Sequence, residues 1–158
     1  DDVESRGLGD VYKRQIMKRE IKFRGKEFET GQWIEGSLTT YPRYYPTITL
    51  VENAELIPKK KTCVVLPETV GQFTGLCDKN GKEIYEGDIV KTKEYGIDIP
   101  NGVFCSNVAG YDNFSVDYID GGFRLLNNQR GFLLCKGNHL EVIGNIYDNP
   151  ELLKENKR

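Results

Sequence analysis

Apolar and polar residues alternate in short segments along most of the chain, which is the pattern of half-buried β-strands. In residues 20–24, Ile21 and Phe23 fall on one face of such a strand, and Trp33 and Phe23 are expected to contribute to the core. The β-branched and aromatic content of the later segments supports the same interpretation. Strands are predicted at residues 32–38, 47–51, 62–66, 72–91 (as a hairpin that runs into a further strand), 114–118, 123–126 and 140–147.

Glycine-containing pairs mark the turns between these strands. Asn80 and Gly81 supply the two residues that a type I′ hairpin turn prefers, so a tight turn is predicted there. Further turns are expected at 86–88 and at 120–122. Residues 93–113 contain three glycines, Pro100 and little periodicity, and are predicted to be a long loop insertion.

The end of the chain has the signals of one short helix. Asn149 suits the N-cap position, Pro150 the first helical position and Glu151 the positive end of the helix. We expect the helix to extend to about Asn156. The predicted fold class is therefore mainly β with a short C-terminal helix.

Residues 1–16 have no apolar period and lie just before Met17, the only methionine. The string from Gly9 to Gln15 resembles translated sequencing-adapter read-through, and such segments are excluded from fold reasoning. The alternative is a disordered N-terminal arm. The interpretation is a leader over 1–16 and a single folded domain over 17–158.

Charge and composition exclude several classes of protein. The 158 residues carry 22 Lys and Arg against 24 Asp and Glu, a net charge of −2, which argues against a surface that attracts phosphate throughout. No stretch approaches the roughly 20 apolar residues of a membrane helix, so no membrane partner is expected. The four cysteines show no Cys-x-x-Cys spacing, and His139 is the only histidine, so no metal and no cofactor is predicted. Without a signal peptide, these cysteines are expected to be reduced thiols in a cytoplasm.

No catalytic residues can be nominated from the sequence. Cys135 and His139 could form a nucleophile and base, but they are four residues apart across Gly137 and are better interpreted as a buried cysteine and a surface histidine. The carboxylates are numerous, and one sequence does not show which of them converge. The glycines lack the spacing of a phosphate-binding loop. An enzyme with an unrecognised site is kept as the weaker alternative.

One segment combines aromatic and basic residues in a way that suits binding. Aromatic rings can stack on unpaired bases or pack against a protein partner, and lysines can neutralise phosphates or guard an edge strand against aggregation. Contact with protein is the preferred interpretation, and single-stranded nucleic acid is the alternative. The candidate surface comprises Tyr41, Arg43, Tyr44, Tyr45, Lys59, Lys60 and Lys61.

Five ordered segments resemble the YopX family of bacteriophage and prophage proteins. They span 19–26 (REIKFRGK), 31–38 (GQWIEGSL), 67–76 (PETVGQFTGL), 78–90 (DKNGKEIYEGDIV) and 142–153 (VIGNIYDNPELL). The resemblance covers residue 18 to about residue 156. It implies an SH3-like small β-barrel with accessory strands or loops, a tendency to self-associate, and action in a bacterial host cytoplasm.

The resemblance implies no established activity and offers no catalytic residues to carry over. The functional hypothesis is therefore a non-enzymatic phage or prophage accessory protein. It is expected to form a homo-oligomer and to bind a host or phage protein. The alternative is a small barrel that binds single-stranded DNA or RNA.

Overall fold

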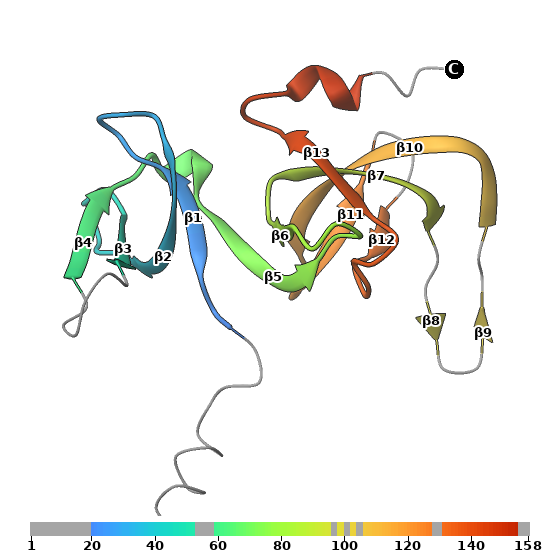
Figure 1. Cartoon of the computed structure of the whole chain (residues 1–158), viewed down its shortest axis with the longest axis horizontal. Coiled ribbons are helices and arrows are strands. Elements are labelled where there is room, and N and C mark those ends of the chain that lie inside the picture. The colour runs from blue at the N-terminus through green and yellow to red at the C-terminus, as the bar shows by residue number, and fades with distance from the viewer. Residues whose placement is uncertain are drawn as a thin grey trace, which may run out of the picture.

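The computed structural model describes residues 20–52, 59–95, 98–99, 102–103, 106–127 and 131–154, and the predicted leader over 1–16 lies outside them. Almost all regular structure is strand, so the mainly β prediction is confirmed (Figure 1). The elements are β1 (Phe23–Lys26), β2 (Trp33–Thr39), β3 (Thr47–Glu52), β4 (Lys59–Val64), η1 (Pro67–Thr69), β5 (Gly71–Cys77), β6 (Glu83–Tyr85), β7 (Asp88–Tyr95), β8 (Asp98–Ile99), β9 (Gly102–Val103), β10 (Ser106–Ile119), β11 (Gly122–Leu126), β12 (Gly131–Leu133), β13 (Glu141–Asn145) and η2 (Pro150–Leu153).

The first sheet has six antiparallel strands in the order β4-β3-β2-β1-β5-β6. The alternation in β3 places Ile48 in the interior with Cys63 and Val65. Gly36 of β2 packs so closely that a Cβ there would lie 2.2 Å from the Thr49 carbonyl oxygen, so a side chain at this position would push β2 and β3 apart. Trp33 and Phe23 are only half-buried, so they lie at the margin of the core.

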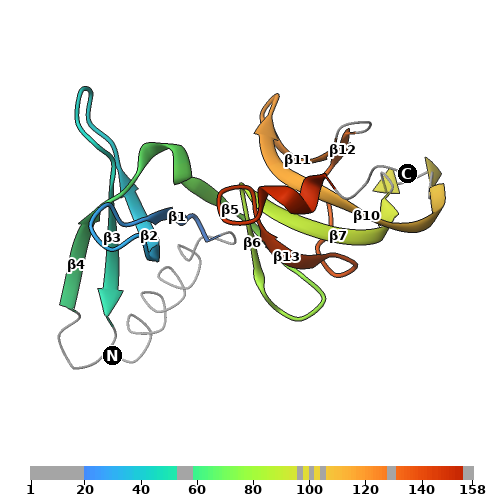
Figure 2. The same ribbon diagram turned by 90° about the horizontal axis from the view of Figure 1, so that it is seen from above.

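The second sheet has five antiparallel strands in the order β12-β11-β10-β7-β13. It carries the larger apolar core, in which the alternating residues Phe114 and Val116 of β10 pack with Val90 of β7. The two views place this sheet at the opposite end of the molecule from β2, β3 and β4, with β5 leading from one to the other (Figures 1 and 2). The buried cluster on this sheet also takes in Ile84 of β6 and Leu140, which precedes β13. Its members are Ile84, Val90, Phe114, Val116, Leu125 and Leu140.

The expected closed barrel is not found among the described residues. At the end of the first sheet, residue 65 just beyond β4 meets residue 27 just beyond β1 in a single bridge, Glu27↔Val65. Of the strands that the structure describes, only β3 lies beside β4 itself. The SH3-like arrangement and the single domain over 17–158 stay predictions.

The type I′ turn lies at a different place from the one predicted. Gly81 has a φ of +82°, but Asn80 does not have a positive φ, because the Asp78 carboxylate accepts the N–H groups of Asn80 and Lys82 and holds a wider turn. Asp120 and Gly121 instead have φ values of +53° and +78° and form a two-residue turn between β10 and β11.

Where the structure describes residues 93–113, they form strands and not the predicted loop insertion. The strands β7 and β10 extend into this region, where Tyr95 pairs with Ser106, and β8 pairs with β9 beyond them. The register shifts between Asn107 and Asp112, which breaks the two-residue alternation and explains why the sequence pattern was missed.

Three smaller predictions also change. Ile21 precedes β1 and is 53% exposed, so it does not share a buried face with Phe23. The predicted C-terminal helix begins at Pro150 but is a single 3₁₀ turn that ends at Leu153, and the Asn149 side chain makes no capping hydrogen bond. The strand predicted over 140–147 is shorter, because the chain turns after Asn145.

Candidate binding site

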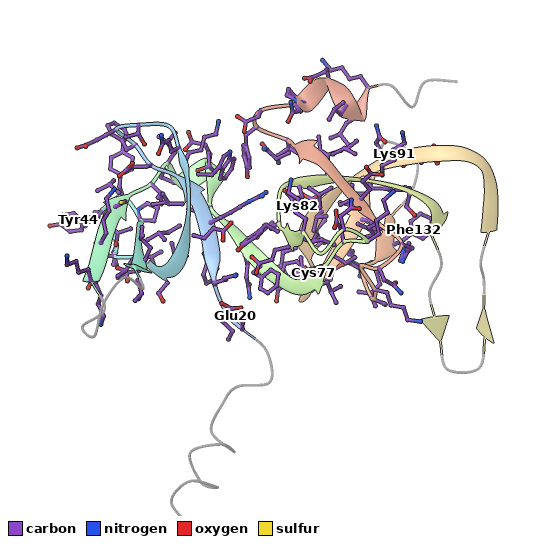
Figure 3. The ribbon with its side chains drawn as sticks, viewed as in Figure 1. Glu20, Tyr44, Cys77, Lys82, Lys91 and Phe132 are labelled. Atoms are coloured by element: carbon purple, nitrogen blue, oxygen red, sulfur yellow. The ribbon has the colours of Figure 1, made fainter. Side chains whose placement is uncertain are left out.

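The three predicted tyrosines lie on the loop between β2 and β3, and all of them are exposed. The N–H of Tyr44 donates to the carbonyl oxygen of Tyr41 over 3.2 Å, and Arg43 between them has a φ of +71°. With Pro42 before it, this is the geometry of a type II turn, which normally has glycine where Arg43 stands. Tyr44 is 78% exposed and points away from the first sheet (Figure 3).

One aromatic residue that the sequence interpretation missed joins this loop. Phe28 follows β1, and its ring centroid lies 5.8 Å from that of Tyr45. Phe28 lies between the strands predicted at 20–24 and 32–38, where an aromatic residue among Lys, Glu and Thr is the sequence signal that points to it. We call Phe28, Tyr41, Tyr44 and Tyr45, which are all exposed, the aromatic end.

The three predicted lysines lie inside β4 and not before it. Because β4 is the last strand of the first sheet, Lys59, Lys60 and Lys61 occupy an edge, as expected of residues that guard against unwanted strand pairing. All three are exposed, and Lys61 Nζ lies 3.7 Å from Glu27 Oε1.

A pocket of about 390 Å³ lies between the turn after β1 and the edge of β4. This volume is within the range of small ligand sites. The pocket brings together Tyr45 and Lys61 of the predicted surface but not its other members, and it adds residues from the turn. Its lining is Glu27, Phe28, Glu29, Tyr45, Lys61, Thr62, Cys63 and Val64.

Neighbouring polar groups shift the pKa values of Glu27 and Cys63, two residues that line the pocket. The Thr30 hydroxyl, and then the Cys63 thiol, hydrogen-bond to Glu27 and lower the pKa of its carboxyl. Burial, and then Glu27, raise the pKa of the Cys63 thiol. At neutral pH the pocket therefore contains a carboxylate and a neutral thiol, and this thiol is poorly suited to nucleophilic attack.

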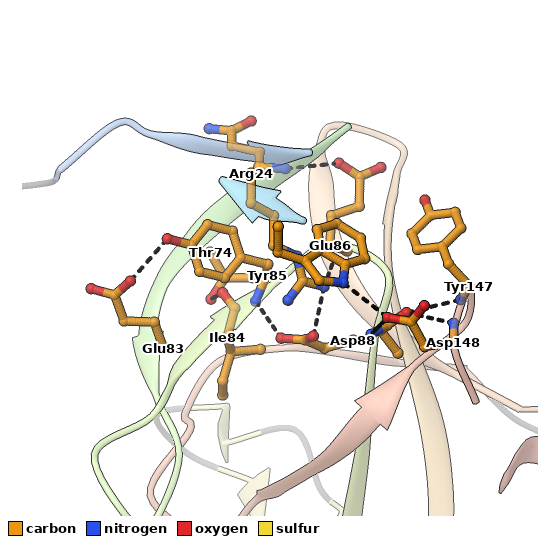
Figure 4. Close-up of polar contacts among 12 residues, drawn as sticks. Arg24, Thr74, Glu83, Ile84, Tyr85, Glu86, Asp88, Tyr147 and Asp148 are labelled. Atoms are coloured by element: carbon orange, nitrogen blue, oxygen red, sulfur yellow. Dashed lines mark hydrogen bonds and ion pairs between the residues drawn. The ribbon is translucent and has the colours of Figure 1, made fainter. Parts of the chain in front are cut away.

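A second polar cluster joins the two sheets (Figure 4). Arg24 of β1 lies 2.6 Å from the Asp88 carboxylate of β7, and its guanidinium carbon lies 4.8 Å from the Trp33 ring and 4.9 Å from the Tyr85 ring. Burial raises the pKa of Asp88, and Arg24 opposes that rise. The N–H of Tyr85 also donates to Asp88 over 2.8 Å.

The margin of this cluster is more exposed. Asp148 pairs with Lys26 and accepts a hydrogen bond of 2.9 Å from Trp33 Nε1. Hydrogen bonds from Lys26, Asn145 and Trp33 lower the pKa of Asp148 to about 2. Charge and ring contacts hold Arg24 in place, although its buried Nε has no hydrogen-bond partner among the described residues. The position of the cluster between β1 and β7 gives it a structural role.

The candidate catalytic residues, Cys135 and His139, are the next to be placed in the structure. Cys135 is exposed, which corrects the expectation of a buried cysteine, and His139 is half-buried. Among the described residues, no three His, Cys, Asp or Glu side chains gather closely enough to hold a metal ion. In the same part of the chain, no helix has the length and apolar character needed to cross a membrane.

The family model described as YopX protein matches residues 22–154, which include both sheets and the aromatic end. The chain belongs to the YopX family. Among solved structures it is similar to the crystal structure of protein EF1440 from Enterococcus faecalis, with 24% identity and a TM-score of 0.49, over 86% of this chain and 99% of that one. A search of curated proteins finds no match.

Proposed function

We propose that this YopX protein is a binding module that contacts a protein partner through the aromatic end. The observation that carries the proposal is the exposure of four aromatic side chains on neighbouring turns, beside a pocket. Apolar surface that gathers in one place marks an interaction site more often than scattered exposed residues do. Aromatic side chains also contribute large contact areas at interfaces.

The strained backbone at Arg43 supports the same conclusion. A non-glycine residue in the left-handed region costs of the order of 1 kcal/mol and persists where the surrounding structure requires it. Here it lifts Tyr44 outward while Tyr45 turns back to Phe28. Such strain is found preferentially at sites of function.

Further expectations from the family resemblance belong to this proposal. They are self-association, a host or phage protein as partner, action in a bacterial cytoplasm, an SH3-like core and a non-enzymatic role. No catalytic cluster emerged from the geometry of the described residues to favour an enzyme. The proposal rests on the exposed aromatic residues and does not depend on which protein is the partner.

Single-stranded nucleic acid is less well supported as a partner. The tyrosines and the three lysines are near one another along the chain, but the charge around the pocket is mixed. Glu27 and Glu29 line it together with Lys61. A groove that follows a phosphate backbone needs predominantly positive charge.

The test compares the aromatic end with an equally apolar residue on the other sheet. Tyr44→Ser is measured beside Tyr118→Ser, since Tyr118 of β10 is also exposed, at 51%. Sedimentation velocity measures self-association over a range of protein concentrations, and a pull-down from host lysate measures partner capture. We expect Tyr44→Ser to weaken either interaction at least tenfold, while Tyr118→Ser leaves both unchanged.

Two results would contradict the proposal. One is a strict monomer at high micromolar concentration that also captures no partner. The other is equal loss of binding in both variants. Binding of a mixed-sequence oligonucleotide at low salt, lost on Tyr44→Ser, would replace the protein partner with nucleic acid.

A further inference from the structure

Along part of its outer side, β4 has backbone groups that no strand in the described part of the chain uses. The Phe28 N–H donates to the Val64 carbonyl oxygen over 2.9 Å, and the Leu66 N–H donates to the Lys26 carbonyl oxygen over 2.9 Å. These bonds show that residues 64 and 66 direct their backbone groups away from β3. Through these bonds, the residues at the end of β1 and just after it pair with the outer side of β4, but only at its last residue and just beyond it.

The direction of the backbone groups alternates along a strand. The Val65 N–H points to the opposite side and donates to the Pro46 carbonyl oxygen over 3.0 Å. It follows that Thr62 and Lys60 direct their N–H and carbonyl groups outward, as residue 64 does. The chain that begins to pair here turns away through Gly31, which has a φ of +68°.

The pocket lies where this pairing stops. It is bounded by residues 27–29 on the departing turn and by residues 61–64 on β4. An added strand beside Thr62 would continue the pairing that Phe28 begins. A side chain of that strand would reach the pocket that Phe28 and Tyr45 line.

The charges on this edge indicate the kind of strand that fits. Lys61 is neutralised in part by Glu27. Lys59 and Lys60 are exposed, and no ion pair joins them to a side chain that the structure describes. Opposite charges on neighbouring strands stabilise pairing, and like charges oppose it. Two copies of this edge would bring six lysines onto one short ladder, so a strand with acidic side chains is the better occupant.

We propose that the outer edge of β4 binds an extended acidic segment of a partner protein by strand addition. Backbone hydrogen bonds to Lys60 and Thr62 would supply affinity, and carboxylates facing Lys59 and Lys60 would supply selectivity. The inference rests on the proposed function, because it names the chemistry of the partner beside the aromatic end.

The experiment uses three fluorescein-labelled ten-residue peptides and the full chain. The first alternates glutamate and valine with one central phenylalanine. The second has lysine in place of every glutamate, and the third is the first with alternate backbone amides N-methylated. Fluorescence polarisation should show that the first binds at least tenfold more tightly than the other two, and more weakly as salt rises.

Variants of the protein locate the site. Thr62→Pro removes the outward N–H at an edge position where proline is tolerated, and Thr62→Val is its control because it keeps that N–H and loses only the hydroxyl. Lys59→Glu with Lys60→Glu should weaken binding of the glutamate peptide roughly tenfold. The matched control is Lys154→Glu, an exposed lysine of the C-terminal turn.

Three outcomes would overturn the inference. They are no binding of the glutamate peptide up to millimolar concentration, equal binding of the N-methylated peptide, and equal or tighter binding of the lysine peptide. The N-methylated peptide keeps the test valid if Thr62→Pro fails to fold. If the protein captures a partner through Tyr44 while the peptide test fails, the edge is wrong and the proposed function stands. If the glutamate peptide binds but capture is absent, or is weakened equally by Tyr44→Ser and Tyr118→Ser, the proposed function is contradicted.

Discussion

The two ends of the molecule use their aromatic residues in opposite ways. In the second sheet, Phe114 is completely buried, and the Phe132 ring meets it edge-on at 5.9 Å. At the aromatic end, the rings of Phe28 and Tyr45 are as close, at 5.8 Å, but both are exposed. The same kind of ring contact therefore stabilises a core in one place and leaves a surface available in the other.

We infer from this difference that one end of the molecule controls stability and the other controls binding. The second sheet buries the main apolar cluster, so its residues should control unfolding. The outer strands of the first sheet keep Ile48 and Cys63 inside, and Val65 just beyond β4 is also buried. The rings of the aromatic end lie on the adjoining turns and are exposed. Substitutions at the aromatic end should change association much more than they change folding.

The largest effect is expected from Phe114→Ala. Removal of a fully buried phenylalanine loses its apolar burial and leaves a cavity, which costs about 3–5 kcal/mol of unfolding free energy. Urea denaturation followed by circular dichroism measures it. The comparison fails if Phe28→Ala, at the exposed end, destabilises the protein as much.

The ion pair between the sheets gives the next effect. Asp88→Asn leaves the Arg24 guanidinium without its counter-charge in a buried position, which should cost about 3 kcal/mol or more. Glu83→Gln is the control, because Lys22 and Glu83 form a comparable but more exposed pair worth about 1 kcal/mol or less. Equal costs in urea would show that the Arg24 cluster does not hold the sheets together.

The margin of the same cluster should respond to acid. Because the folded protein lowers the pKa of Asp148 from 3.8 to about 2, its contribution is present above about pH 4 and is lost as the pH falls toward 2. The carboxylate is partly exposed, so screening limits the effect to about 1 kcal/mol or less. The urea midpoint of Asp148→Asn should fall less than that of the original protein over this interval, and an identical fall would contradict the assignment.

The smallest effect is a gain in stability at the aromatic end. Arg43→Gly removes a side chain from a left-handed position and should stabilise the fold by up to about 1 kcal/mol. Thermal unfolding measures this change. A loss of stability would show that the Arg43 side chain makes contacts that outweigh the strain.

The sequence predicted the strands well where alternation was local. Phe114 and Val116 are buried at the expected spacing, and Asp120 and Gly121 turn the chain as expected. The prediction failed over 93–113, where the register shift removes the alternation. It also misplaced the type I′ turn, because the bond between the Asp78 side chain and the backbone outweighs the preference of Asn80.

The candidate site was predicted only in part. Exposed tyrosines on a loop with proline are recognisable from composition, and Lys59, Lys60 and Lys61 signalled an edge strand. The pocket was not predictable, because Phe28 and Glu27 reach Tyr45 and Cys63 only after β1 and β4 come together. That contact depends on strand order, which local periodicity does not contain.

Photo-crosslinking tests the separation of the two ends most directly. Benzoylphenylalanine would replace Tyr44 in one variant and Tyr118 in another, and both would be irradiated at matched concentration with host lysate and without it. If the aromatic end is the binding surface, position 44 gives a discrete crosslinked partner or dimer and position 118 gives none. A discrete product from position 118 alone, or identical products from both positions, would contradict it.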